Sequence, residues 1–144
     1  MIQQLSVFLE NKSGRLAEMT RVLGDASVNM HALMVADTTE FGVIRIICDN
    51  PVRAKAVLEE AGFGVSVTLV TAVEIPDRPG GLADVLEALD AAGVNVEYAY
   101  CFVEPSGDAA VDVFKVDTEG AETALRNAGF KVMSDDELYA PDGS

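Results

Sequence analysis

Apolar and polar residues alternate along the chain with the two periods that are typical of strands and amphipathic helices. Residues 3–10 alternate as a half-buried strand does, with its apolar side formed by Leu5, Val7 and Leu9. Over residues 14–26 the apolar positions recur at helical spacing and predict a buried face made of Leu16, Met19, Leu23 and Ala26. The chain is therefore expected to open with a strand followed by a helix.

The next segments predict two more strands and a second helix. Residues 28–36 and 41–48 are apolar and β-prone. A helix is expected over 51–61, with Asn50 as its N-cap and a glycine directly after it. A fourth strand then begins at Val65.

The same pattern occurs a second time in the chain. An offset of 66 places Val7, Gly14, Leu16, Ala17, Leu23, Ala26, Val28 and Asn29 on Val73, Gly80, Leu82, Ala83, Leu89, Ala92, Val94 and Asn95. The second copy predicts strands and helices at 69–75, 80–92, 94–103, 109–116, 118–128 and 130–133. In its first helix we expect an inward face of Leu82, Val85, Leu86 and Leu89. Polar hairpin connections are expected at 37–40 and 105–108.

Each copy thus reads β-α-β-β-α-β, which predicts the α+β, ferredoxin-like plan of an antiparallel sheet with both helices on one face. We expect a first unit at 1–68, a second unit at 69–137 and an acidic tail at 138–144. Units of about 67 residues are marginal alone. We therefore expect the uncovered sheet faces to be buried by the sister unit and by a second chain in a homodimer.

Composition and charge exclude several classes of function. A net charge of −14 repels phosphate backbones and anionic lipids, so nucleic acid and membranes are not expected partners. No apolar run is long enough to span a bilayer and no signal peptide is evident, which predicts a cytoplasmic protein. One histidine and two separate cysteines predict no metal, no cofactor and no catalytic residues. Both cysteines, Cys48 and Cys101, are expected to be buried.

The connection from the first strand to the first helix is rich in glycine in both copies. It reads Asn11, Lys12, Ser13, Gly14, Arg15 and Leu16 in the first copy, and Asp77, Arg78, Pro79, Gly80, Gly81 and Leu82 in the second. Glycine lets another molecule approach the backbone, and the unpaired N–H groups at the start of the helix form an anion site. We expect each loop to be able to hold a carboxylate.

An asparagine follows the same helix in each copy, Asn29 and Asn95. Its side chain offers both a donor and an acceptor, as a zwitterionic ligand requires. Glu97 shares a strand face with Asn95 and either binds a ligand ammonium or is an exposed carboxylate. The alternative is that the glycines and asparagines serve only as turn and helix-end residues.

The second loop, followed after one helix by Gly93, Val94, Asn95 and Val96, resembles the signature of the ACT domain. The resemblance covers both copies, although the first has Ser13 and Ser27 where the second has Pro79 and Gly93. It implies a tandem ACT protein of the stand-alone, amino-acid-binding kind, with ligands at the interface between units. The implied binding residues are Arg78, Pro79, Gly80, Gly81, Leu82 and Asn95, with a parallel set of Lys12, Ser13, Gly14, Arg15, Leu16 and Asn29.

The prediction from the sequence is thus a non-enzymatic sensor. It binds a free amino acid and regulates a partner of amino-acid metabolism, such as a biosynthetic enzyme. The alternative is a regulatory or scaffolding subunit of a biosynthetic enzyme in which ligand binding is lost or secondary.

Overall fold

The computed structural model describes residues 1–10, 12–36, 41–103, 109–116 and 120–134. Its elements are β1 (Ile2–Glu10), α1 (Arg15–Asp25), β2 (Met30–Ala36), β3 (Phe41–Cys48), α2 (Pro51–Glu60), β4 (Gly64–Pro76), α3 (Gly81–Ala91), β5 (Val96–Val103), β6 (Ala109–Val116), α4 (Ala121–Asn127) and β7 (Lys131–Val132). The expected hairpins at 37–40 and 105–108, Asn11, the first residues of the fourth predicted helix and the tail at 138–144 lie outside the described residues.

The contacts divide the chain into two compact units. The first unit is Gln3–Thr68, and the second consists of Met1–Ile2 with the chain from Leu69 onward. Strand β4 contributes its first part to the first unit and its second part to the second unit. The N-terminal ammonium of Met1 pairs with Glu122 Oε1 of α4 at 2.8 Å.

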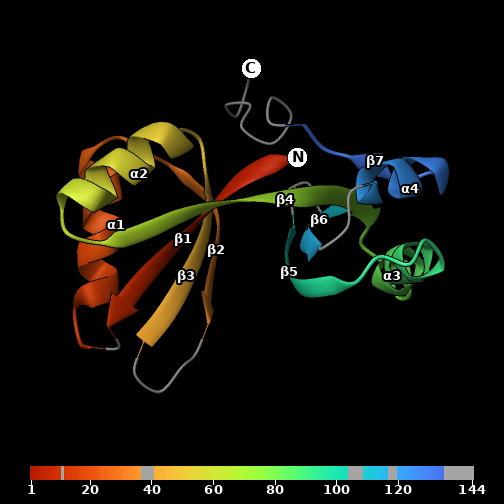
Figure 1. Ribbon diagram of the computed structural model, residues 1–144, viewed down its shortest axis with the longest axis horizontal. Helices are drawn as coiled ribbons and strands as arrows, with labels where there is room; N and C mark the ends of the chain where they lie inside the picture. Colours follow the sequence, from red (N-terminus) through yellow and green to blue (C-terminus); the bar gives the residue numbers. More distant parts are fainter. Residues whose placement is uncertain (11, 37–40, 104–108, 117–119, 135–144) are drawn as a thin grey trace. The chain divides into compact units, whose positions relative to one another are not determined.

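Strand order confirms the βαββαβ plan in each unit. The first unit has the order β2-β3-β1-β4, in which β1–β3 and β2–β3 are antiparallel pairs. The second has the order β7-β4-β6-β5, with antiparallel pairing throughout. In each unit both helices lie on one face of the sheet (Figure 1). This is the ferredoxin-like arrangement that the sequence predicts.

Helix boundaries follow local chemistry. Helix α2 starts with a proline after Asn50, whose side chain accepts a hydrogen bond from the Arg53 N–H at 3.2 Å. The glycine after α2 has a φ of 93°, a left-handed conformation that ends helices. Strands β2 and β5 begin two residues later than predicted, because the chain still turns there: Ser27 has a φ of 60° and Gly93 a φ of 74°.

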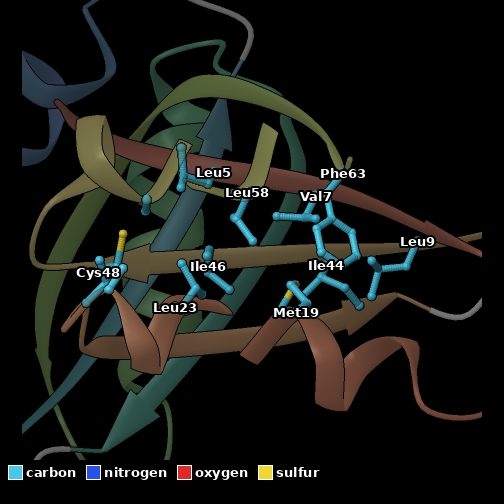
Figure 2. Packing of buried hydrophobic residues seen from close by; sticks show 13 residues of the cluster. Leu5, Val7, Leu9, Met19, Leu23, Ile44, Ile46, Cys48, Leu58 and Phe63 are labelled. Carbon is cyan, nitrogen blue, oxygen red and sulfur yellow. The ribbon is translucent and has the colours of Figure 1, made fainter. Parts of the chain in front are cut away.

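Each unit has a hydrophobic core between its sheet and its helices. Figure 2 shows the core of the first unit, in which side chains of β1 and β3 meet those of both helices. It includes Leu5, Val7, Leu9, Met19, Leu23, Ile44, Ile46, Cys48, Leu58 and Phe63. The second core is built the same way from Val73, Ile75, Val85, Leu89, Val94, Phe114, Val116 and Leu125 among others. Helices α1 and α3 each turn part of their apolar face into a core, as predicted for Met19, Leu23, Val85 and Leu89.

Three predicted inward leucines are exposed instead. Leu16 and Leu82 are 38% and 46% exposed, and Leu86 is 37% exposed. Leu16 and Leu82 occupy the first turn of α1 and α3, at the end of each apolar stripe, so helical spacing alone does not bury them. Leu86 lies at the flank of the Val85–Leu89 stripe.

The two cysteines also differ. Cys48 is buried, as predicted, but the prediction for Cys101 is wrong, because this residue is exposed. Cys101 lies on β5, which ends the strand order of the second unit, so its side chain stands at the sheet edge. In the described part of the chain, no helix is long and apolar enough to cross a membrane.

Candidate functional site

The loop between β1 and α1 turns sharply at Gly14, which has φ 88° and ψ −13° and caps the helix without a side-chain hydrogen bond. The Lys12 N–H donates to the carbonyl of Glu10 at 2.8 Å, and the Arg15 N–H donates to the carbonyl of Lys12 at 3.3 Å. Lys12 also pairs with the Glu10 side chain at 2.7 Å. The hydrogen bond from the Lys12 ammonium lowers the pKa of the Glu10 carboxyl group. Ser13 lies within this turn and is exposed.

The loop between β4 and α3 repeats this geometry. Gly80 has φ 85° and ψ −8°, and it again caps the helix without a side chain. The Arg78 N–H donates to the carbonyl of Pro76 at 2.9 Å, and the Gly81 N–H donates to the carbonyl of Arg78 at 3.1 Å. A Cβ at Gly81 would lie 2.7 Å from the Pro76 carbonyl oxygen, so only glycine fits there without a shift. Pro79 is exposed between them.

Both loops leave backbone N–H groups at the start of a helix without an intrahelical acceptor. The first i→i−4 bonds are made by Glu18 N–H to Gly14 O and by Asp84 N–H to Gly80 O, each at 3.0 Å. The N–H groups before these, on Leu16 and Leu82 and on the alanine that follows each, have no acceptor inside the helix. The two loops are therefore alike in a feature that favours a bound carboxylate.

Each helix start also carries an arginine paired with its own acidic residue. Arg15 Nη1 lies 2.8 Å from Glu18 Oε2, and the Arg15 guanidinium stacks over the Phe63 ring at 4.7 Å. Arg78 Nη2 lies 2.9 Å from Asp84 Oδ2. The two arginines do not occupy equivalent positions in the repeat, because the offset of 66 matches Arg78 to Lys12. These pairs partly neutralise both cations at the helix starts.

A shallow hollow lies next to the second loop. It is lined by Arg78, by the end of β4 and by β7 with the residues before it. Its two cations are already paired, Arg78 with Asp84 and Lys131 with Glu74 at 3.5 Å. The positive charges that line the hollow are therefore already balanced by neighbouring carboxylates.

The structure places the two asparagines away from the loops of their own units. Asn29 follows the C-terminal end of α1, where its N–H donates to Asp49 Oδ1 at 3.1 Å and its carbonyl accepts from the Asp49 N–H at 3.1 Å. The loop lies at the other end of α1, and the 11 residues of this helix span roughly 16 Å. Asn95 has the same relation to Gly80 across the 11 residues of α3.

Strand register leads to the same conclusion. Glu10, at the loop end of β1, pairs with Phe41 at the start of β3, whereas Met30 pairs with Cys48 at its end. The predicted residues thus form two groups in each unit, a loop and a distant asparagine. One unit alone does not bring both groups to one small ligand.

The sequence reasoning missed a buried carboxylate, Asp112 of β6, which is 3% exposed. It pairs in register with Cys101 on β5, and a side-chain hydrogen bond joins the two. Burial raises the pKa of Asp112, and the Cys101 hydrogen bond opposes this shift. Burial also raises the pKa of the Cys101 thiol, and the charges of Asp112 and Asp77 raise it further. A charged residue inside the apolar run of β6 was the available signal.

The other titratable groups have ordinary structural surroundings. Glu97 pairs with Lys115 at 3.1 Å and is exposed, in agreement with its interpretation as an exposed carboxylate. Burial raises the pKa of Cys48 to about 11, which makes it an inert core thiol. Among the described residues, no three His, Cys, Asp or Glu side chains gather as metal ligands would.

The chain belongs to the ACT domain family: a family model described as an ACT domain pair matches residues 1–139. The solved protein BT0572 from Bacteroides thetaiotaomicron is 36% identical over 97% of this chain and 96% of its own, with a TM-score of 0.92. The ligand-free regulatory subunit of aspartate kinase from Thermus thermophilus shares the fold, with a TM-score of 0.69 and 17% identity over 88% of this chain and 92% of its own. The comparison with curated proteins found no match.

Proposed function

We propose that this ACT domain pair is a non-catalytic sensor of a free amino acid in the cytoplasm, where it regulates a partner protein of amino-acid metabolism. The observation that carries the proposal is the repeated loop geometry at Gly14 and Gly80, which leaves helix N–H groups available for a carboxylate in both units. The similarity in fold to an aspartate kinase regulatory subunit supports a regulatory role.

The ligand site in this proposal lies where two ACT units meet. The loop residues, Lys12–Leu16 or Arg78–Leu82, hold the ligand carboxylate. Because each asparagine lies a helix length from its own loop, the asparagine that completes a site comes from a different unit. A homodimer would supply the further units, with residues 1–68 and 69–137 as the two ACT units of each chain and 138–144 as a tail.

The second candidate is a regulatory or scaffolding subunit whose ligand binding is lost. A specific observation favours it: Glu18 and Asp84 already place a carboxylate in the first turn of α1 and α3, paired with Arg15 and Arg78. These side chains compete with an external anion for the positive end of each helix.

Thermal unfolding of the full chain with each of the twenty amino acids separates the two candidates. A true ligand at 100 times its Kd should stabilise the protein by about 2.7 kcal/mol. Titration calorimetry then gives the affinity and the number of sites. If no amino acid raises the Tm or releases heat, the sensor proposal is wrong and the scaffold candidate stands.

A further inference from the structure

The hollow beside the second loop is formed by one unit alone, since all of its lining residues belong to the second unit. Its volume is about 340 Å³, within the range of small-molecule sites. It lies where the pairing of β7 with β4 ends: Val73 pairs with Val132 and Glu74 with Lys131, and the chain turns away at Gly129, which has a φ of 91°. A ligand in this hollow therefore needs no contact from another unit.

Charges of both signs line the hollow. Arg78 and Lys131 are cations, and Glu74 is a carboxylate. Lys131 Nζ lies 3.5 Å from Glu74 Oε2, farther than the roughly 2.7–2.9 Å of a good charge-assisted hydrogen bond. The two side chains are 58% and 35% exposed, and ion pairs of this kind contribute little to stability. Both charges can therefore take other partners at a small energetic cost.

The balance of charge decides which ligand fits. Each cation is already paired with a carboxylate, so a simple anion would leave that carboxylate without its cation. A zwitterion brings a positive charge of its own. Its carboxylate can take donors from Lys131 and Arg78 while its ammonium group donates to Glu74. Pro76 and Phe130 in the lining offer apolar surface to the rest of such a ligand.

The first unit lacks this arrangement. The offset of 66 matches Glu74 to Phe8. An offset of 67, which aligns the last helix and strand of the two copies, matches Lys131 to Gly64. A Cβ at Gly64 would lie 3.7 Å from Phe8 Cδ2, so an aromatic ring lies beside a glycine where the second unit has an ion pair. Because neither side chain carries a charge, the zwitterion contacts exist once per chain.

We propose that the hollow binds a free amino acid, with the carboxylate of the ligand between Lys131 and Arg78 and its ammonium group on Glu74. The inference goes beyond the proposed function, because this site is complete within the second unit and needs neither an asparagine nor a second chain. It is separate from the helix start of α3, whose N–H groups on Leu82 and Ala83 do not line the hollow.

NMR spectroscopy of the isotope-labelled full chain, titrated with each of the twenty amino acids, locates the site. We expect a ligand to shift the backbone amides of Glu74, Phe130 and Lys131, whereas the amides of Leu82 and Ala83 report on the helix start. An amino acid that shifts only the amides at the helix start overturns the inference while the sensor proposal stands. If none of the twenty shifts any amide, the inference and the proposed function both fail.

Charge variants then test the individual contacts. Calorimetry compares the amino acid that binds most tightly with its α-hydroxy acid, which lacks the ammonium group. Glu74→Gln should weaken the amino acid about 10-fold without weakening the α-hydroxy acid, whereas Lys131→Gln should weaken both about 10-fold. The matched control is Glu59→Gln, in the exposed ion pair of Lys55 and Glu59 on α2, and it should alter neither affinity.

Two results of the calorimetry would overturn the inference. Equal affinity of the wild type for the amino acid and its α-hydroxy acid would show that the ammonium group makes no contact. Wild-type affinity in Glu74→Gln would show that this carboxylate does not bind the ligand. Thermal melts confirm that each variant is folded, and the comparison of the two ligands on the wild type requires no variant.

Discussion

Asp112 and Ile44 stand at the same place in the two ACT units, each facing the helices from the strand that pairs with the first strand of its unit. Ile44 belongs to the apolar cluster shown in Figure 2. Asp112 instead places a carboxyl group there. Cys101 forms a side-chain hydrogen bond with it, and its Oδ2 has no hydrogen-bond partner among the described residues. The second unit thus buries a carboxyl group where the first unit buries an aliphatic side chain.

The Asp112→Asn variant should be more stable than the wild type at pH 7, by about 1–3 kcal/mol. Burial raises the pKa of Asp112 above its ordinary value of 3.8, so the folded state favours the protonated acid. The penalty is absent below the unfolded-state pKa, grows as the pH rises from that value, and is complete above the folded-state pKa. Urea unfolding at pH 7 and at pH 3.5 measures the difference. Equal stability of the two proteins at pH 7 would contradict the assignment of a charged, poorly solvated group.

Thiol chemistry should distinguish the two cysteines. We expect iodoacetamide to modify Cys101 in the native protein, whereas Cys48 reacts only on unfolding because it is buried. Burial and the charge of Asp112 raise the pKa of Cys101, so Asp112→Asn should lower that pKa and speed its alkylation at pH 8 several-fold. Mass spectrometry of timed digests gives both rates. A Cys101 rate that does not respond to Asp112→Asn would show that the two side chains are not coupled.

Two glycine substitutions should have opposite effects. Gly81→Ala places a Cβ 2.7 Å from the Pro76 carbonyl oxygen and should destabilise the protein by about 1–3 kcal/mol. Gly24→Ala, within α1, meets only the end of the Arg21 side chain at 3.9 Å and should stabilise by about 0.5–1 kcal/mol. Thermal melts of both variants check the signs. A neutral Gly81→Ala would mean that the second loop is looser than the contact implies.

The asparagines test whether ligand sites are shared between units. Asn95→Ala should weaken amino-acid binding by about 1.5–3 kcal/mol, because it removes a hydrogen bond to a charged group. Asn29→Ala reports on the parallel site. If a second chain provides the asparagine, affinity should also fall when the protein is diluted below its dimerisation constant, which sedimentation velocity measures. Full affinity in both alanine variants would show that neither asparagine contacts the ligand.

The order of elements could be predicted from the sequence because each strand and helix carries its own hydrophobic period. In α1 and α3, spacing alone identified Met19, Leu23, Val85 and Leu89 as core residues. The exposure of Leu16 and Leu82 could not be predicted, since spacing shows which positions share a helix face but not how much of that face is covered. The exposure of Cys101 likewise depends on β5 lying at the sheet edge, which is a property of topology.

The candidate site could be predicted only in part. Glycine and the turn signals located both loops, and the structure shows the same left-handed turn in each. Spacing in the sequence did not show that Asn29 and Asn95 lie a helix length from those loops. Asp112 was missed because its significance depends on strand register, which matches it to Ile44 only once both sheets are paired.

Strand β4 runs without interruption from Gly64 to Pro76 and supplies the closing strand of one fold and the opening strand of the next. Side chains of a strand point alternately to its two faces. Up to Thr68 this alternation serves the first unit, and from Leu69 onward it serves the second, in which Val73 and Ile75 point into the core. The two copies of the repeat are consequently joined inside one strand rather than by a loop, so removing β4 would take a strand from both units at once.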